Sequence, residues 1–313
     1  MKGIGEFYYC SEFSRRLGEK AFGTASLGTV WFLLEYSLTW KSKALEESAL
    51  SDEVKTFFAS ALGRIPNSRF LFVKRDRPCS TDINFFIVRT RERRPFVLRY
   101  GLPGYAGLLG VNLDEAAAGR PGEGGEVHRG PLFLVCTHGR RDKCCAKFGV
   151  PLYRALRESA GDAVWQSSHV GGDRFAANLV CFPHGLFYAH AGAESGARIL
   201  EAYREGRLSL ADEFRGRSCY SYPVQAAEFF VRRETGVDAV EGLRYLSSER
   251  AGERTWRVRF AGPGDAGVHE ALVTTRPSEE RRPITCHSPE ERSVPEFVLD
   301  EYRFVAAATP SAP

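Results

Sequence analysis

The sequence predicts an α/β protein with two related halves lying side by side and a smaller C-terminal α+β segment. One observation is the order of a strand, a helix and three strands, which occurs in residues 29–100 and again in residues 131–188. A second is the chain length of 313 residues, which suggests about two domains at roughly 150 residues each. A third is the region from about residue 210 onward, which does not follow this order.

The composition is that of an ordinary globular protein. The net charge is +4, with 43% hydrophobic and 26% charged residues, which excludes a disordered chain, a fibrous protein and a highly basic nucleic-acid tail. Eight cysteines are too few for a disulfide scaffold at this length. The apolar run at 30–34 is too short to span a bilayer, and no charged-then-apolar leader opens the chain. We therefore expect a cytoplasmic protein with reduced thiols.

The first half begins with an apolar, aromatic run at 29–36, which is typical of a buried strand. Apolar residues then follow near-helical spacing over 44–63, and Gly63 marks the expected end of that helix. Three strand-like runs follow, at 70–73, 84–88 and 95–100. The stretch at 115–130 is rich in Gly, Ala and Glu and predicts a linker or surface loop.

The second half repeats this order. A strand is expected at 131–135 and a helix at 151–160, with Pro151 at its first position and Gly161 as its end. Further elements are expected as strands at 163–165, 179–182 and 186–188 and a closing helix at 194–205.

The C-terminal segment combines a helix with a strand pair. Residues 223–233 predict a helix that starts with a proline. The alternating run at 256–260 predicts a half-buried strand that pairs around 271–274. The predicted domains are an N-terminal half at 1–125, a second half at 126–208 and a C-terminal segment at 209–313.

The side chains that can carry chemistry are concentrated in two segments, CTHGRRDKCC and SSHVGGDRF. Cys136 ends a predicted strand, and Cys144 and Cys145 are expected in the loop that enters the next helix. His169 is expected at the end of the following strand. These residues therefore belong to the same end of one α/β unit, where open sheets form ligand sites.

Three chemistries suit this set of residues. An iron–sulfur centre uses thiolates and accepts imidazole on one iron. A structural zinc site uses four ligands in short paired spacings, but seven or eight residues separate Cys136 from Cys144 and Cys145. Thiol–disulfide chemistry would use a low-pKa cysteine beside Arg140 and Arg141, although the adjacent cysteines lack the usual two-residue gap. The residue pattern alone leaves all three open.

Taken together, the two segments resemble the sucrase/ferredoxin-like family of thioredoxin-like [2Fe-2S] proteins, which includes actin patch distribution proteins. The similarity extends to GTA at 23–25 and to RGR at 215–217. The resemblance implies a thioredoxin-like fold for the two halves and a [2Fe-2S] cluster in the second. It also implies one-electron transfer with an unidentified redox partner protein. The composition and the short apolar run, in turn, lead us to expect no nucleic-acid and no membrane partner.

The resemblance also implies a ligand set. The family pattern places two thiolates at the positions of Cys136 and Cys145, and its two imidazoles at the positions of His169 and Asp173. Asp173 departs from that pattern, because the family has a second histidine there.

Two points of ligation stay open. The fourth ligand is either Asp173 or another side chain, His138 or Cys181. Otherwise the cluster is labile or absent in this protein. Cys144 would replace Cys145 if the register shifted by one residue. Cys181 is otherwise expected to be a small core residue, and the cysteines that are isolated in the sequence are expected to be structural: Cys10, Cys79, Cys219 and Cys286.

Other functions compete with the cluster. The chain could be a cluster-free thiol redox enzyme or sensor with Cys145 as nucleophile and His169 as its base. It could also be an interaction module that keeps only the fold. The basic run at 89–94 is interpreted as a solvated hairpin, with a docking patch for an acidic redox partner as the alternative.

Overall fold

The computed structural model describes residues 9–76, 82–265, 267–288 and 290–306. Its centre is one mixed sheet of ten strands. The strands are β1 (Val30–Glu35), β2 (Ser68–Lys74), β3 (Ile83–Arg89), β4 (Phe96–Leu102), β5 (Gly125–Val127), β6 (Leu132–Cys136), β7 (Val164–Ser167), β8 (Leu179–Phe182), β9 (Leu186–Tyr188) and β10 (Phe214–Arg217). Their order in the sheet is β10-β9-β8-β6-β7-β2-β1-β3-β4-β5.

Two sets of strands pair in the same way within this sheet. In the first set, β1 is parallel to β2 and antiparallel to β3, which pairs with β4. In the second, β6 is parallel to β7 and antiparallel to β8, which pairs with β9. The sets join where Val73 and Lys74 of β2 pair antiparallel with Ser167 and Gln166 of β7. The predicted mixed α/β class is therefore confirmed.

Six α-helices accompany the strands in the described part of the chain. They are α1 (Cys10–Arg16), α2 (Asp52–Arg64), α3 (Leu113–Ala117), α4 (Lys143–Ala160), α5 (Ala193–Arg204) and α6 (Tyr222–Thr235). Helix α2 packs on the first strand set, whereas α4 and α5 pack together on the second. None of these helices combines the length and the apolar character that crossing a bilayer requires.

The large sheet has apolar side chains on both faces because residues along a strand alternate in direction. In β1, Phe32 points into the core under α2, whereas Trp31 points into a core on the opposite face. That second core extends from one strand set to the other, and it contains Cys136 and Cys145. Two of the predicted site residues are therefore inside the protein.

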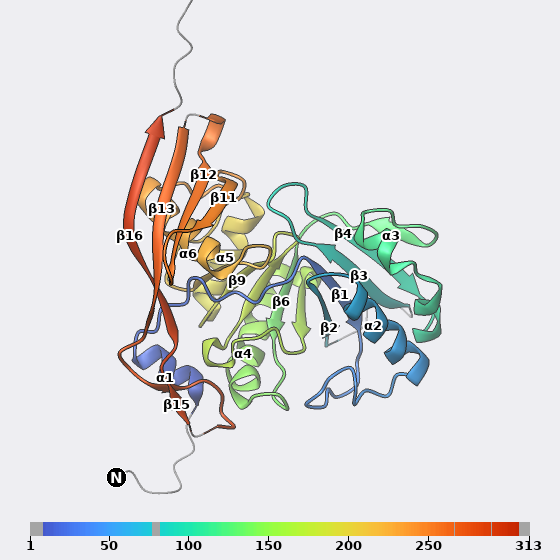
Figure 1. Cartoon of the computed structure of the whole chain (residues 1–313). Helices are drawn as coiled ribbons and strands as arrows, with labels where there is room; N and C mark the ends of the chain where they lie inside the picture. Colours follow the sequence, from blue (N-terminus) through green and yellow to red (C-terminus); the bar gives the residue numbers. More distant parts are fainter. Residues whose placement is uncertain (1–8, 77–81, 266, 289, 307–313) are drawn as a thin grey trace, which may run out of the picture.

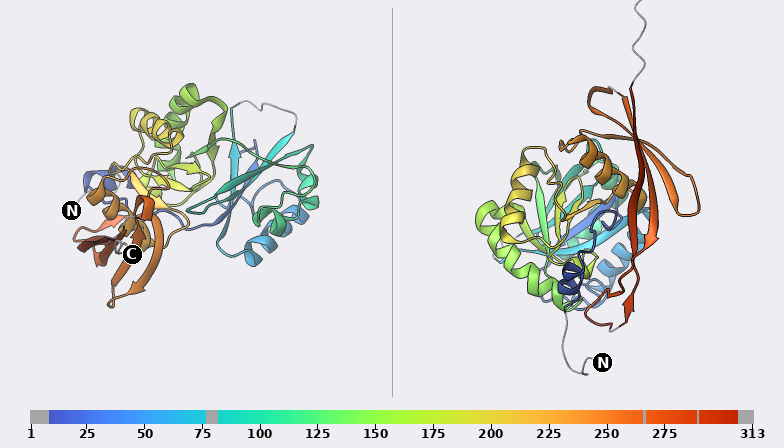
Figure 2. Two further views of the ribbon diagram at one scale, coloured as in Figure 1. Left: turned by 90° about the horizontal axis from the view of Figure 1, so that it is seen from above. Right: turned by 90° about the vertical axis from the view of Figure 1, so that its left-hand side faces the viewer.

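The C-terminal segment forms a separate antiparallel sheet. Its strands are β11 (Arg244–Arg250), β12 (Thr255–Ala261), β13 (Gly267–Pro277) and β16 (Pro295–Ala306). Helix α6 packs on this sheet, which stands beside the large one (Figures 1 and 2). Between β13 and β16 the chain forms two short strands, β14 (Arg282–Pro283) and β15 (Glu291–Arg292), and β14 contacts the N-terminal helix α1.

Two helix starts differ from the sequence prediction. Helix α2 begins at Asp52, because the Ser51 side chain accepts a hydrogen bond from the backbone N–H of Val54 and caps it. Helix α4 begins eight residues before Pro151, which lies inside it. Asp142 caps this earlier start, so Cys144 and Cys145 lie in the first turn of α4 and not in a loop.

Several short elements were not predicted. The stretch at 115–130 was expected to be a loop, but it contains the end of α3 and the strand β5. Helix α1 has only seven residues and no side-chain cap, and β10 has only four residues. Neither length provides enough periodicity to be recognised.

Close packing between α4 and β6 generates a stability prediction. An added Cβ at Gly149 would overlap the backbone carbonyl oxygen of Cys136. We expect Gly149→Ala to lower the free energy of unfolding by about 1–3 kcal/mol. The backbones of α4 and β6 cannot move apart as easily as a flexible side chain moves aside. Chemical denaturation measures the change.

Gly63 provides the matched control, because it lies near the end of α2 with open space where a Cβ would be placed. Gly63→Ala should be neutral or stabilising by up to about 1 kcal/mol. Equal effects of the two substitutions would contradict the packing argument.

Candidate metal centre

Cys136 is held at the end of β6. Its backbone N–H donates to the carbonyl oxygen of Asn178 at 3.1 Å, and it stands opposite Ser167 of the parallel strand β7. The carboxyl ends of β6 and β7 therefore lie next to each other, as the sequence predicted. The Cys136 residue is 1% exposed.

Cys145 is presented by the first turn of α4. The carboxylate of Asp142 accepts the backbone N–H of Cys144 at 2.9 Å, and the carbonyl oxygen of Asp142 accepts that of Cys145 at 3.1 Å. Successive helical side chains diverge by about 100°. The two adjacent cysteines consequently point to different places: Cys145 lies with Cys136 and His169, whereas Cys144 lies with other residues.

His169 follows β7 by two residues, and two contacts fix its backbone. Ser168 is bonded to Phe72 of β2 through its backbone N–H at 2.8 Å and through its hydroxyl, which accepts at 3.0 Å. The backbone N–H of His169 donates to Nδ1 of His138 at 3.2 Å. Nε2 of His138 contacts the carbonyl oxygen of Lys41 at 2.8 Å. Both nitrogens of His138 are thus engaged, and its ring positions His169.

A turn of two glycines brings Asp173 to the same place. Gly171 and Gly172 have φ values of +94° and +82°, a region that side chains with a Cβ rarely adopt. After this turn, Oδ1 of Asp173 lies 3.2 Å from Nδ1 of His169 and 3.7 Å from Sγ of Cys145. The carboxylate is buried, so it lies on the side of the group that faces the protein interior.

Arg215 holds this glycine turn in place through hydrogen bonds, a role that the sequence did not predict. Its guanidinium is buried and donates to the carbonyl oxygen of Gly171 at 3.1 Å and to Oδ1 of Asn178 at 2.7 Å. Asn178 in turn donates to the carbonyl oxygen of Gly172 at 2.9 Å. The RGR segment drew attention to this arginine, but nothing in the sequence shows that it contacts the glycines.

Three of the predicted ligands form one compact group. The ligand atoms of Cys136, Cys145 and His169 all lie within 4.8 Å of one another. Sγ of Cys145 is 3.9 Å from Nδ1 of His169. The two cysteines are buried, whereas the His169 side chain is 20% exposed. His169 is therefore the edge of the group that faces solvent.

Contacts within the group shift the pKa values of its members. The pKa of Cys136 is well below that of a free thiol, chiefly because of its hydrogen bond with Cys145, whose own pKa is correspondingly raised. Burial lowers the pKa of His169, but the hydrogen bond and charge of Cys136 outweigh it and raise the net value. Burial raises the pKa of the Asp173 carboxyl. These shifts favour the thiolate form at Cys136, the form in which a cysteine binds a metal.

The remaining cysteines lie elsewhere. Cys181 of β8 faces the core beneath α4 and α5, on the opposite side of the sheet from Cys136. Cys10 and Cys286, which are isolated in the sequence, meet Cys144 in a second group. Cys219 belongs to neither group, and Cys79 is outside the described residues.

Comparison with known proteins places these observations in a family. The sequence model of the Sucrase/ferredoxin-like family matches residues 22–216, which include all four predicted ligands. A curated relative is the Altered inheritance of mitochondria protein 32 of Meyerozyma guilliermondii, which is 30% identical over 95 residues. That alignment covers 27% of this chain and 34% of the relative, about a third of its length. No solved structure matches. The chain belongs to the Sucrase/ferredoxin-like family.

Proposed function

We propose that this protein is an electron carrier that holds a [2Fe-2S] cluster through Cys136, Cys145, His169 and Asp173. The observation that carries the proposal is the convergence of two buried thiols and an imidazole within 4.8 Å, inside the region that matches the family. When bound, the cluster supplies the capacity to take up and release one electron.

The donor set suits an iron–sulfur centre. Thiolates are the usual ligands of such clusters, and imidazole replaces thiolate on one iron in some of them. Cys136 and Cys145 come from the end of a strand and the first turn of a helix, two rigid elements that keep the sulfur atoms close together. Their burial shields the sulfur atoms from water, and hydrogen bonding and exposure tune the potential of such sites.

Asp173 is the best-supported fourth ligand. Its carboxylate oxygen lies beside both His169 and Cys145. The rival His138 has both ring nitrogens engaged with backbone groups, and burial lowers its pKa, which fits a neutral ring that accepts at Nδ1. The rival Cys181 points into the core on the other face of the sheet.

Electrons would enter and leave at His169, the exposed edge of the group. Close to it, a hollow of about 400 Å³ is lined by His138, Lys74 and Arg140, among others. The two cationic side chains favour a redox partner protein with an acidic surface. His138, which lines this hollow, accepts the backbone N–H of His169, so the hollow adjoins the proposed cluster.

Further expectations from the sequence accompany this proposal. We assign the two strand sets to thioredoxin-like halves, at 1–125 and 126–208, because their strands pair in the same order. The C-terminal segment at 209–313 then contributes β10 to the sheet of the second half. A cytoplasmic location stays a prediction.

A cluster-free thiol enzyme has less support. Cys145 would be its nucleophile, with His169 as base at 3.9 Å. However, the hydrogen bond with Cys136 and burial raise the pKa of Cys145, and its side chain is inaccessible to a substrate. A reactive cysteine needs the opposite properties, a low pKa and exposure.

The two adjacent cysteines allow a direct test of ligation. We expect Cys136→Ser and Cys145→Ser each to lose most of the iron, because a hydroxyl is a poor substitute for a soft thiolate. Cys144→Ser should keep its iron, and Cys219→Ser is the matched control outside both groups. Iron and acid-labile sulfide are measured after anaerobic purification. Loss of iron in Cys144→Ser with retention in Cys145→Ser would mean that the ligand is Cys144.

Asp173 has a separate prediction, because a carboxylate adds one negative charge relative to the imidazole of the family pattern. We expect Asp173→His to raise the reduction potential, since a neutral ligand makes electron uptake easier. Asp173→Ala should lose iron or change the visible spectrum. Protein-film voltammetry and absorption spectra provide the measurements. Unchanged iron and spectra in Asp173→Ala, with iron lost in His138→Ala or Cys181→Ala, would identify a different fourth ligand.

A further inference from the structure

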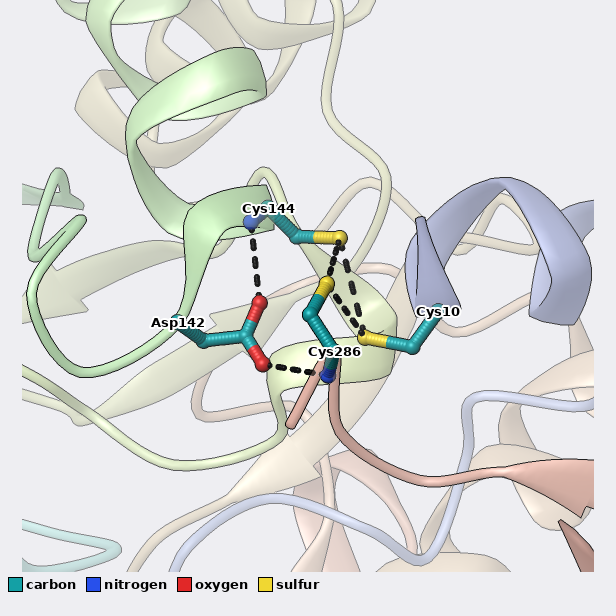
Figure 3. A group of neighbouring side chains, drawn as sticks. All are labelled: Cys10, Asp142, Cys144 and Cys286. Carbon is teal, nitrogen blue, oxygen red and sulfur yellow. Dashed lines mark hydrogen bonds between the residues drawn. The ribbon is translucent and has the colours of Figure 1, made fainter. Parts of the chain in front are cut away.

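A second group of cysteines lies on the other side of the first turn of α4. Cys10 begins α1, Cys144 lies in α4, and Cys286 lies between β14 and β15. Their sulfur atoms form a triangle, with Sγ–Sγ distances of 3.6 Å from Cys10 to Cys144, 3.2 Å from Cys144 to Cys286 and 3.7 Å from Cys286 to Cys10 (Figure 3).

Asp142 completes this group. One carboxylate oxygen accepts the backbone N–H of Cys144 at 2.9 Å, and the other accepts that of Cys286 at 2.8 Å (Figure 3). A carboxylate oxygen and the three sulfur atoms all lie within 4.8 Å of one another. Two of the three cysteines are therefore held in place by the carboxylate that lies beside them.

Apolar packing accounts for the burial of these cysteines, but not for the carboxylate beside them. Cys10, Cys144 and Asp142 are each fully buried, and a buried carboxylate needs compensation by a cation or by several hydrogen bonds. Its partners in this group are two backbone N–H groups and the Cys286 thiol, so no cationic side chain of the group compensates the carboxylate. The backbone N–H of Ser11 also donates to Sγ of Cys144 at 3.4 Å, so this sulfur atom has a polar contact besides the two other sulfur atoms.

We propose that Cys10, Cys144 and Cys286, with Asp142 as the oxygen ligand, form a zinc site. Zinc binds four ligands tetrahedrally, with Zn–S distances of about 2.3 Å. A regular tetrahedron of that size has sulfur atoms about 3.8 Å apart, so the observed triangle needs only a small expansion. Three sulfur atoms and a carboxylate oxygen within 4.8 Å of one another provide the four ligands of a single ion.

The zinc site would join three distant segments of the chain. Cys10 and Cys286 are 134 and 142 residues from Cys144, and both lie outside the region that matches the family. Beside the site, Nε2 of His287 contacts the carbonyl oxygen of Arg141 at 2.8 Å. The ion would therefore fix α1 and the segment after β14 to the start of α4. All four of its ligands would come from the protein, as is typical of a structural site.

Metal analysis of the full chain tests the proposal. After growth with zinc and anaerobic purification, we expect one zinc per chain in the wild type, in Cys136→Ser and in the control Cys219→Ser. Cys10→Ser and Cys286→Ser should bind zinc at least about tenfold more weakly, since even changes to groups that only orient ligands cost that much. Both should keep their iron, because the Asp142 cap still holds Cys145.

Iron and zinc are measured separately, so failure of this site is distinguishable from failure of the proposed cluster. Only traces of zinc in the wild type, or zinc retained in the Cys10→Ser/Cys286→Ser double variant, would overturn the proposal. A disulfide within the triangle, found by mass spectrometry of the anaerobic protein, would also overturn it. If the serine variants do not fold, Co²⁺ alone is titrated into chelator-treated wild type and Cys219→Ser. Absorption bands typical of three thiolate ligands support the site, and their absence contradicts it.

Discussion

The carboxylate of Asp142 is the constraint on which both groups of cysteines depend. It caps α4 by accepting the backbone N–H of Cys144, and this cap starts the helix eight residues before its proline. Because helical side chains diverge by about 100° per residue, a helix that starts here sends Cys144 and Cys145 in different directions. A loop at the same place would leave both thiols free to compete for one metal. One cap therefore separates two potential metal centres that are adjacent in the sequence.

The large sheet provides the rest of the positioning. Parallel β6 and β7 end together, so Cys136 and the segment before His169 meet without a long connection. The antiparallel junction of β2 with β7 then ties that segment to the first strand set through Phe72 and Ser168. Arg215, which is buried, fixes the glycine turn that delivers Asp173. Cys136 and Cys145 thus come from a strand and a helix, whereas hydrogen bonds to both strand sets and to Arg215 fix the segment that carries His169 and Asp173.

Sequence patterns predicted the mixed α/β class, most strands of the large sheet, and the meeting of Cys136, Cys145 and His169. These predictions succeeded where the signal was local, in apolar runs and in the ends of consecutive strands. The predicted start of α4 was wrong. Pro151 suggested a first helical position, whereas the helix begins after its cap, Asp142. The second group could not be predicted, because Cys10 and Cys286 are more than a hundred residues from Cys144. Only the path of the chain brings α1 and the segment after β14 to that point.

The central claim is that Cys144 and Cys145 serve two different metal centres. X-ray absorption at the iron and zinc edges of one anaerobic sample tests it most directly. At the zinc edge, the account predicts three sulfur neighbours at about 2.3 Å and one oxygen at about 2.0–2.2 Å. At the iron edge, it predicts a mixed shell of sulfur with nitrogen or oxygen, together with an iron–iron contribution. A zinc shell without sulfur, or an iron shell of sulfur alone, would contradict it.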